Sequence, residues 1–386
     1  MERRTLLRLL PAPLITGWPV RAGSGSPGRV VIAGAGIIGA SIAYHLAKRG
    51  AQVTILEKQR PGAGATRNSF AWLNAPKQPR PYYELNLLGV LGWRRLCLEI
   101  GNELQMQWGG SVQWTAPGNG SEALKRRIDR FRQWGYPMHL ADETEFARLL
   151  PRVTPGPFGA ACFSDLEGTV DPMHALGVLL KKAQEFGARL EYPAEVTGLD
   201  LRSGLAGVQT TRGLVEADVL VLASGVDTPR LAQMAGVKVP LKESAGLLAH
   251  TAPHARLIDR VTLAPGADIK QTPDGRITTG TDFGATSTFD TSKETGMKLL
   301  ENAQRFLPGL KGATLDYVTL GHRVLPEDGF PIIGFADKHP NLYIACMHSG
   351  MTMAPIIGQL AATEILDRAE IDLLSTFRLS RFPLSS

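Results

Sequence analysis

The clearest pattern in this chain is residues 29–57, RVVIAGAGIIGASIAYHLAKRGAQVTILE, which has the order strand, turn, helix, strand. Residues 30–33 are continuously apolar, as expected for a buried parallel strand. Gly34, Gly36 and Gly39 then give the spacing G-x-G-x-x-G, which permits a tight turn, close approach of a pyrophosphate and close helix packing. Glu57 ends the second strand, where its carboxylate can accept hydrogen bonds from ribose hydroxyls. The segment therefore predicts a dinucleotide-binding site at the start of the helix.

A glycine-rich turn in an ordinary α/β sheet is the alternative, because G-x-G-x-x-G alone is a weak signal. That alternative does not explain why an apolar strand, an apolar helix face and a terminal acid coincide with the three glycines. The acid also favours an unphosphorylated ribose, so FAD or NAD is expected rather than NADP.

The composition is that of a globular protein with two lobes. The chain has 386 residues, which is too long for one compact core, and 44% of them are hydrophobic. No apolar stretch approaches the roughly 20 residues that a membrane-spanning helix needs, so no membrane span is expected. The net charge of +6 comes from scattered Lys and Arg. The densest basic cluster, residues 125–132, is typical of a solvated helix face, and no nucleic-acid partner is expected.

The cysteines and histidines show no metal-ligand spacing. Cys97, Cys162 and Cys346 are far apart, and the eight histidines include no H-E-x-x-H. The sequence therefore predicts neither a disulfide framework nor a metal site.

Two interpretations of the N-terminus stay open. Arg3 and Arg4 precede a short apolar segment that ends in small residues near Ala22, which resembles a twin-arginine export leader. Three prolines interrupt this segment, so the alternative is a disordered extension over residues 1–27. The first interpretation predicts an exported protein and the second a cytoplasmic one.

The rest of the chain alternates helical and strand patterns. The small residues at 61–69 would let the backbone lie along a flat ligand, or else form a plain solvent loop. Asp171 followed by Pro172 is typical of a helix N-terminus. Helices are predicted near residues 82–100, 122–134, 172–186, 292–306 and 354–366, and strands near 189–199, 207–216, 218–223 and 341–345. Strands alternate with turns over residues 240–320, which predicts a mostly antiparallel sheet in a second lobe.

With these segments in order, the chain resembles the D-amino-acid oxidase superfamily of flavoproteins, in particular its glycine oxidase and sarcosine oxidase branch. The resemblance extends from Gly28 to about Leu374. Its segments are Gly34-x-Gly36-x-x-Gly39 with Glu57, then Gly64-Ala65-Thr66, Gly168-x-x-Asp171-Pro172, Ala223-Ser224-Gly225, and Arg323 to Gly334 with Gly350 to Pro355.

The resemblance implies an α/β fold with a Rossmann-type FAD-binding domain, similar to that of glutathione reductase. An α+β substrate domain, built on a mostly antiparallel sheet, is inserted into it. Residues 28–104, 158–237 and 324–378 would form the FAD-binding domain, residues 105–157 and 238–323 the substrate domain, and residues 1–27 a leader or extension.

The resemblance also implies that FAD is bound without a covalent bond. Relatives with covalent flavin use a cysteine or a histidine at positions that here hold Gly321 and Asn68. The residues implied in cofactor binding are Gly34, Ala35, Gly36, Ile37, Ile38, Gly39, Glu57, Lys58, Gly64, Ala65, Thr66, Asn68, Ser69, Val196, Ser224, Gly225, Arg323, Ser349, Gly350, Met351 and Thr352.

Arg323 is the residue expected to bind the substrate. In glycine oxidase-like chains an arginine five positions before the aspartate of such a turn, here Asp328, holds the substrate carboxylate. A guanidinium suits this role because its planar fork offers two parallel donors. The alternative is a structural salt bridge. His348 stands where such chains have a second arginine, and it either orients the amine or is a packing residue; His322 is expected to point to the opposite face from Arg323 and to be structural.

These residues imply an FAD-dependent enzyme that oxidises an amino acid or a related primary or secondary amine. Hydride transfer to flavin N5 would give an imine that then hydrolyses, and oxygen, a quinone or a carrier would accept the electrons. The alternatives are oxidation of a 2-hydroxy acid or demethylation of an N-methyl compound on the same fold. A non-catalytic FAD-binding subunit of an amine dehydrogenase complex and an NAD-dependent dehydrogenase are further alternatives.

Overall fold

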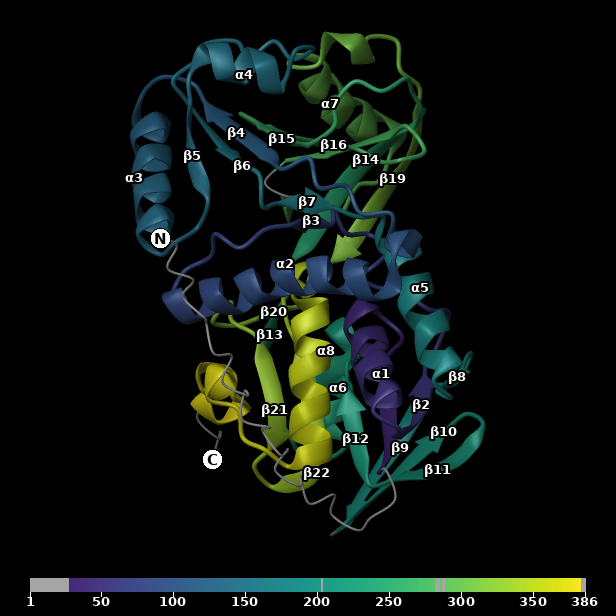
Figure 1. The fold of residues 1–386 in the computed structure, drawn as a ribbon. Coiled ribbons are helices and arrows are strands. Elements are labelled where there is room, and N and C mark those ends of the chain that lie inside the picture. Colours follow the sequence, from purple (N-terminus) through teal and green to yellow (C-terminus); the bar gives the residue numbers. More distant parts are fainter. Residues whose placement is uncertain (1–27, 203, 282–284, 287–288, 383–386) are drawn as a thin grey trace, which may run out of the picture.

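A six-stranded sheet lies in the lower lobe in Figure 1, with the strand order β21-β22-β12-β1-β2-β8. Its strands are β1 (Arg29–Ala33), β2 (Gln52–Leu56), β8 (Arg189–Glu191), β12 (Val219–Leu222), β21 (Ile332–Ala336) and β22 (His339–Cys346). Neighbouring strands are parallel except at the edge, where β21 is antiparallel to β22. This is the Rossmann-type sheet that residues 29–57 predict.

The computed structural model describes residues 28–202, 204–281, 285–286 and 289–382. The expected leader or extension, residues 1–27, lies outside the described residues. Within the described part of the chain, no helix is both long and apolar enough to cross a membrane.

Both faces of the six-stranded sheet are covered, and β1 shows how. Val30 and Ile32 pack into a core that includes residues of α1 (Ile37–Lys48), α2 (Arg80–Ile100), α5 (Pro172–Glu185) and α8 (Gly350–Asp367). Val31 and Ala33 point to the other face and pack against the sheet of β9 (Val196–Arg202), β10 (Leu205–Thr210) and β11 (Gly213–Ala217), and against α6 (Thr228–Gln233). Successive side chains of a strand alternate between its faces, so a strand buried on both faces reads as a continuous apolar run.

The upper lobe is built on a nine-stranded sheet with the order β18-β14-β17-β16-β15-β4-β6-β5, in which β19 also pairs with β14. The strands are β4 (Ser111–Thr115), β5 (Met138–Ala141), β6 (Ala160–Ser164), β14 (Ala245–Pro253), β15 (Val261–Ala264), β16 (Ala267–Gln271), β17 (Arg276–Gly280), β18 (Ala285–Thr286) and β19 (Leu315–His322). The pairing of β15 with β4 is parallel and the other pairings are antiparallel, which confirms the predicted mostly antiparallel sheet.

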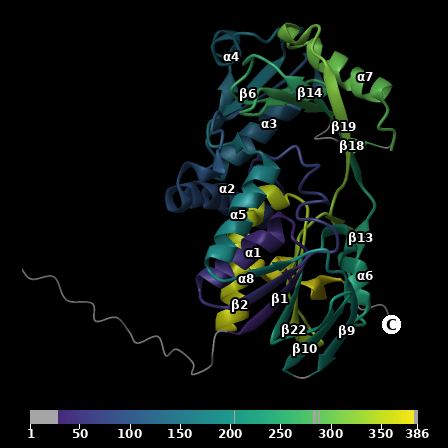
Figure 2. The same cartoon turned by 90° about the vertical axis from the view of Figure 1, so that its right-hand side faces the viewer.

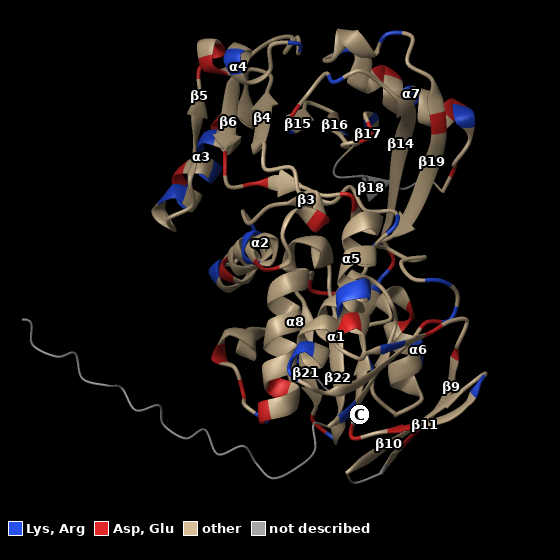
Figure 3. Cartoon of the chain, turned by 45° about the vertical axis from the view of Figure 1, so that its right-hand side comes forward, with Lys and Arg blue, Asp and Glu red and all other residues tan. Residues whose placement is uncertain are grey.

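Three helices pack on the upper lobe: α3 (Asn119–Gln133), α4 (Glu143–Leu149) and α7 (Lys293–Gln304). The remaining two-stranded pairs are β3 (Trp72–Leu73) with β7 (Gly168–Thr169), and β13 (Leu241–Lys242) with β20 (Leu325–Pro326). Short 3-10 helices span Asn102–Leu104, Gly225–Asp227, Pro308–Leu310, Asp372–Phe377 and Leu379–Arg381. Charges of both signs are interspersed on the outer helices, α3 and α7 among them (Figure 3).

The helix α2 lies where the two lobes meet (Figure 2) and fixes the position of α8. Gly89 and Gly92 of α2 face α8 so closely that a Cβ on Gly92 would be 2.8 Å from Cβ of Pro355. Pro355 has no N–H, so the carbonyl of Met351 lacks its usual helical donor. The indole N–H of Trp93 on α2 donates to that carbonyl at 2.7 Å instead. The first turn of α8 is therefore held by α2 as well as by its own backbone.

Several boundaries differ from those predicted. The nucleotide-binding segment was expected to resume at residue 158, but β6 (Ala160–Ser164) pairs with β4 and β5 in the nine-stranded sheet. The predicted strand at 189–199 is two strands, since Pro193 cannot donate to a ladder and separates β8 from β9. The predicted strand at 207–216 is the hairpin of β10 and β11. The helix α8 begins at Gly350, four positions before the predicted start at residue 354.

The C-terminal segment is attached to the lower lobe through a buried ion pair. Glu364 of α8 has a side chain that is 2% exposed, and the Arg378 guanidinium binds both of its oxygens. The hydroxyl of Tyr343 donates to the same carboxylate at 2.8 Å, and the Ile371 N–H at 3.2 Å. The strand β22, the helix α8 and the segment that follows α8 therefore share one buried negative charge.

We expect Arg378→Met to lower the free energy of unfolding by about 3–5 kcal/mol, because it leaves a buried carboxylate without its cation. Urea unfolding of the variant and the wild type measures the difference. Arg80→Met is the control, because Arg80 and Glu84 form an exposed pair and such pairs contribute at most about 1 kcal/mol. Equal losses in the two variants would contradict the role of the buried pair.

Candidate functional site

A pocket runs from the carboxyl ends of the parallel strands to the contact between the lobes. The loops that follow β1, β2, β12 and β22 line it, together with the loop at 62–77 and the turn after β19. Ligands of open α/β sheets bind outside the carboxyl ends of the strands, where the connections diverge. Of the residues expected at the cofactor, Ala35 and Gly39 lie outside the pocket lining, and the others line it.

In the glycine turn after β1, some glycines are needed by the fold itself and one is needed only to leave room for a ligand. Gly34 has φ +111°, and a Cβ there would be 2.5 Å from the Ala223 carbonyl oxygen. A Cβ on Gly39 would collide with the Gly34 carbonyl oxygen. Gly36 has an ordinary φ of −82°, and its nearest neighbour on the Cβ side is Oγ1 of Thr66 at 3.4 Å. The protein itself therefore needs glycine at 34 and 39, whereas at 36 a side chain would fill the pocket.

The donors around this turn fit the pyrophosphate and ribose of a dinucleotide. The N-terminus of α1 presents backbone N–H groups and the positive end of the helix dipole. Oγ1 of Thr66 accepts from the Ile37 N–H at 3.1 Å, which holds the loop at 64–69 over the helix start. The carboxylate of Glu57 accepts from the N–H groups of Ala35 at 3.1 Å and Gln59 at 2.9 Å. A carboxylate has about four acceptor positions, so acceptors remain for ribose hydroxyls.

An ion-pair cluster lies beside the nucleotide end of the pocket. Lys58 contacts the Asp227 carboxylate at 3.4 Å, and the Arg230 guanidinium binds Asp227 at 2.8 Å and Glu195 at 3.2 Å. All four residues line the pocket. The sequence pointed to Lys58 alone, because the other three follow strands whose order in the sheet only the tertiary structure reveals.

The N-terminus of α8 lines the other part of the pocket. Ser349 precedes the helix in the left-handed region, with φ +58° and ψ +21°, and residues 349–352 all face the pocket. Oγ1 of Thr352 lies 3.4 Å from both the Asn74 N–H, which donates to it, and the Trp72 carbonyl. The positive end of a helix dipole favours an electron-rich group, so this end of the pocket suits a ring carbonyl.

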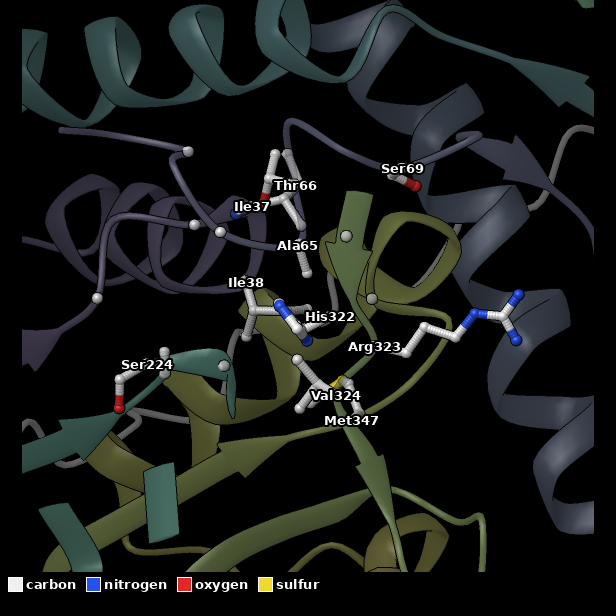
Figure 4. Close-up of a pocket in the computed structure, with 18 of the residues that line it drawn as sticks. Ile37, Ile38, Ala65, Thr66, Ser69, Ser224, His322, Arg323, Val324 and Met347 are labelled. Carbon is white, nitrogen blue, oxygen red and sulfur yellow. Dashed lines mark hydrogen bonds between the residues drawn. The ribbon is translucent and has the colours of Figure 1, made fainter. Parts of the chain in front are cut away.

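Arg323 and His322 both line the pocket, and they point in different directions (Figure 4). Arg323 follows β19, and its N–H donates to the Ser244 carbonyl at 2.7 Å. Its side chain extends away from α1. His322 lies near Ile38 and Val324 in the middle of the view. The different orientations agree with the expectation, and the pocket is lined by both side chains, so the structural role expected for His322 stays a prediction.

His348 is an uncharged imidazole at neutral pH. Burial, together with the positive charges of Lys77 and Arg323, lowers its pKa from 6.5 to about 4. Oγ of Ser349 lies 3.4 Å from its Nδ1, and Oγ accepts from the Tyr82 hydroxyl at 3.2 Å. His348 therefore cannot replace the positive charge of a second arginine, but it can make a neutral hydrogen bond.

Lys77 also lines this end of the pocket, and no sequence pattern pointed to it. It lies in a Pro-flanked segment just before α2, and no motif includes it. Burial, together with the charges of Arg127 and Arg323, lowers its pKa from 10.5 to about 8, and Glu167 opposes this shift. Within the described ranges, no group of three His, Cys, Asp or Glu side chains has the arrangement of a metal site.

Comparisons with known proteins agree with this geometry. A family described as "FAD dependent oxidoreductase" (DAO) matches residues 29–364. Glycine oxidase from Geobacillus kaustophilus (strain HTA426) is 28% identical over 373 residues, which cover 91% of this chain and 96% of that protein. The crystal structure of glycine oxidase from Geobacillus kaustophilus has a TM-score of 0.84 at 26% identity and covers 92% of this chain and 99% of the other. The structure of L-proline dehydrogenase from P. horikoshii has a TM-score of 0.83 at 25% identity, with coverages of 92% and 98%.

We expect Gly36→Ala to weaken FAD binding roughly 10- to 100-fold, because an added methyl group in a packed site costs about 1–3 kcal/mol. Quenching of flavin fluorescence measures the dissociation constant. The urea midpoint of unfolding without added FAD should stay close to that of the wild type, since the new Cβ has 3.4 Å of room in the protein.

Gly39→Ala is the matched comparison, because its Cβ would collide with backbone. This variant should lower the urea midpoint clearly even when no FAD is added. If Gly36→Ala lowered the midpoint as much as Gly39→Ala, the distinction between a ligand requirement and a fold requirement would be wrong.

Proposed function

We propose, since the chain belongs to the FAD dependent oxidoreductase family, that it oxidises an amino acid or a related primary or secondary amine to an imine. The bound FAD supplies the two-electron oxidation. The imine then hydrolyses to a 2-oxo acid or an aldehyde, and oxygen, a quinone or a carrier takes up the electrons. The observation that carries this proposal is that Arg323 and the neutral His348 both line the end of the pocket beside the α8 N-terminus.

The similar proteins support an amine substrate. Glycine oxidase and L-proline dehydrogenase are named for amino acids, one with a primary and one with a secondary amine. Both match nearly the whole of this chain, so both lobes correspond.

Arg323 has the role of binding the substrate carboxylate in this proposal. A guanidinium binds a carboxylate through two parallel hydrogen bonds, which fixes both the position and the direction of the substrate. The carboxylates that line the described pocket are Glu57, Glu195 and Asp227, and the latter two are paired with Arg230 near the nucleotide end.

His348 has the role of orienting the amine. Because its pKa is about 4, the imidazole stays neutral at pH 7 and can accept a hydrogen bond from the amine. The Ser349 hydroxyl lies against Nδ1 of the ring, and the Tyr82 hydroxyl donates to that Ser349 hydroxyl. Positioning of this kind increases the reaction rate, because the substrate loses its orientational freedom when it binds and not in the reaction step. It does not require a strong base.

FAD is dissociable in this proposal. A Cβ on Gly321 would lie 2.7 Å from Cβ of Asn68, so the two positions that carry a covalent link in some relatives touch one another here. A cysteine at 321 would have to displace the loop, and neither Gly321 nor Asn68 offers a nucleophile.

Anaerobic mixing of the FAD-loaded protein with amines tests the proposed reaction. Loss of the flavin absorbance near its visible maximum is expected with at least one member of a panel of D- and L-amino acids, glycine, sarcosine and proline. A panel of 2-hydroxy acids is the control. Bleaching by hydroxy acids alone would replace the proposal with hydroxy-acid oxidation, and no bleaching by any amine would favour a non-catalytic FAD-binding subunit.

Arg323→Ala should lower kcat/KM for carboxylate substrates by an amount that corresponds to about 2–5 kcal/mol, because a buried charge pair is lost. The apparent KM should rise, as measured by steady-state turnover with the substrate that bleaches the flavin. The corresponding amine without a carboxylate should be oxidised equally by both proteins. Unchanged kinetics with the carboxylate substrate would contradict the binding role of Arg323.

A further inference from the structure

The helix α2 has a stripe of exposed apolar side chains on its outer face. Leu88, Leu91 and Leu98 have exposed fractions of 37%, 43% and 90%. Their spacing of three and seven positions puts them on one face of the helix. In Figure 2, α2 lies at the left edge of the described part of the molecule, so this face points outward. Exposed apolar side chains that lie side by side indicate an interaction surface, whereas singly scattered ones do not.

The opposite face of α2 already has its partners within the chain. Its buried side chains include Tyr82, Leu85, Trp93 and Leu96. Gly89 lies on the same side, where a Cβ would be 2.4 Å from the Thr352 carbonyl oxygen of α8. The leucines of the outer face therefore take no part in holding α8, and another molecule can cover them.

Two residues of opposite charge lie on the outer face with the leucines. Glu84 lies one turn before Leu88, and Arg95 lies one turn after Leu91. The Arg95 guanidinium donates to the neutral amide oxygen of Gln359 at 3.3 Å, a contact that leaves its charge unbalanced. The face therefore has the order acid, leucine, leucine, base along the helix.

We propose that this face of α2 binds a second copy of the chain. The two α2 helices would be antiparallel about a two-fold axis that lies at the level of Gly89 and Val90. Leu88 of each copy then lies opposite Leu91 of the other. A two-fold contact is self-complementary, so each of these contacts forms twice.

The charges favour this arrangement over the other ways of pairing two α2 helices. In the two-fold register Glu84 of each copy lies opposite Arg95 of the other. A shift of one helical turn would place Glu84 opposite Leu91 in one direction, or Leu88 opposite Arg95 in the other, and would bury a charge against an apolar side chain. A parallel pair in register would place like charges opposite one another, which is unfavourable.

The most exposed leucine also has an apolar partner in this register. Leu98 of one copy lies opposite Pro81 of the other, near the two ends of the contact. The helix has 21 residues, so the contact extends over about 30 Å. Because one helix pair buries less than the roughly 1,200 Å² of the smaller stable interfaces, we expect dissociation in roughly the micromolar range.

The contact is independent of the proposed reaction, because Glu84, Leu88, Leu91, Arg95 and Leu98 lie outside the pocket lining. Sedimentation velocity of the FAD-loaded protein from about 1 to 200 µM tests it, since this range includes the expected dissociation constant. The average mass should rise from that of one chain towards that of two. A monomer at every concentration would overturn the proposal.

Leu91→Glu should raise the dissociation constant of the dimer about tenfold or more, because two carboxylates would lie against leucines. Leu140→Glu is the matched control, since Leu140 is 46% exposed on β5 of the upper lobe. The control should stay within about twofold of the wild type, because a surface substitution outside an interface has little effect. Both variants should bind FAD as the wild type does, which shows that they fold. A dimer that Leu91→Glu leaves intact would overturn the proposal.

Charge reversal tests the two-fold register. Glu84→Arg alone and Arg95→Glu alone should each weaken the dimer about tenfold or more, because each places like charges opposite one another. An equimolar mixture of the two variants should recover a dimer close to the wild type in affinity, because one copy then has two bases and the other has two acids. A mixture that dimerises no better than the separate variants would overturn the proposed arrangement.

Discussion

The close approach of two backbone segments at the carboxyl ends of β1 and β12 determines the rest of the site. Gly34 turns there with φ +111°, and the Ala223 carbonyl occupies the place where its Cβ would be. This contact lets α1 start directly at the sheet edge with its N-terminus toward the pocket. α8 packs against α1 just as closely, because Ser41 of α1 donates to the Ala354 carbonyl at 2.6 Å and Gly358 has no side chain to hold the helices apart. Two helix N-termini therefore face one elongated cavity.

The charges along this cavity divide it into two functional parts. The acids that line it, Glu57, Glu195 and Asp227, lie at the nucleotide end, where hydroxyls and amides are the expected partners. Lys77 and Arg323 line the other end. The cations Lys58 and Arg230 also line the nucleotide end and pair with Asp227 and Glu195, so most of the charge there is balanced within the protein.

Residues 29–57 could be interpreted from the sequence because each of their signals is local. The apolar run, the glycine spacing and the terminal acid lie within one supersecondary unit. Asp171 with Pro172 marks the start of α5 in the same way, since the Asp171 side chain accepts from the His174 N–H.

Lys77 and His322 could not be found, because their place in the pocket depends on how β19 and the segment before α2 meet across the lobes. The start of α8 at Gly350 was missed because Trp93, from another helix, satisfies a carbonyl that the proline leaves free. The position of β6 was missed for a similar reason, as strand pairing between distant segments has no local signal.

The neutral state of His348 follows from its burial and, to a smaller extent, from the cations around it. Glycine oxidase-like chains have a second arginine at this position. An arginine there would bring a third positive charge beside Lys77 and Arg323. Taking like charges out of water together is expensive, and a guanidinium cannot release its proton to avoid that expense. An imidazole can release its proton, and with a pKa of about 4 His348 is neutral at pH 7. Lys77 brings a cation to this end of the pocket from the segment before α2, whereas position 348, just before α8, brings none at neutral pH. A cation that comes from the segment before α2 can hold a different part of a substrate than a cation that comes from position 348. The loss of the second arginine therefore changes how a substrate is bound and does not only weaken its binding.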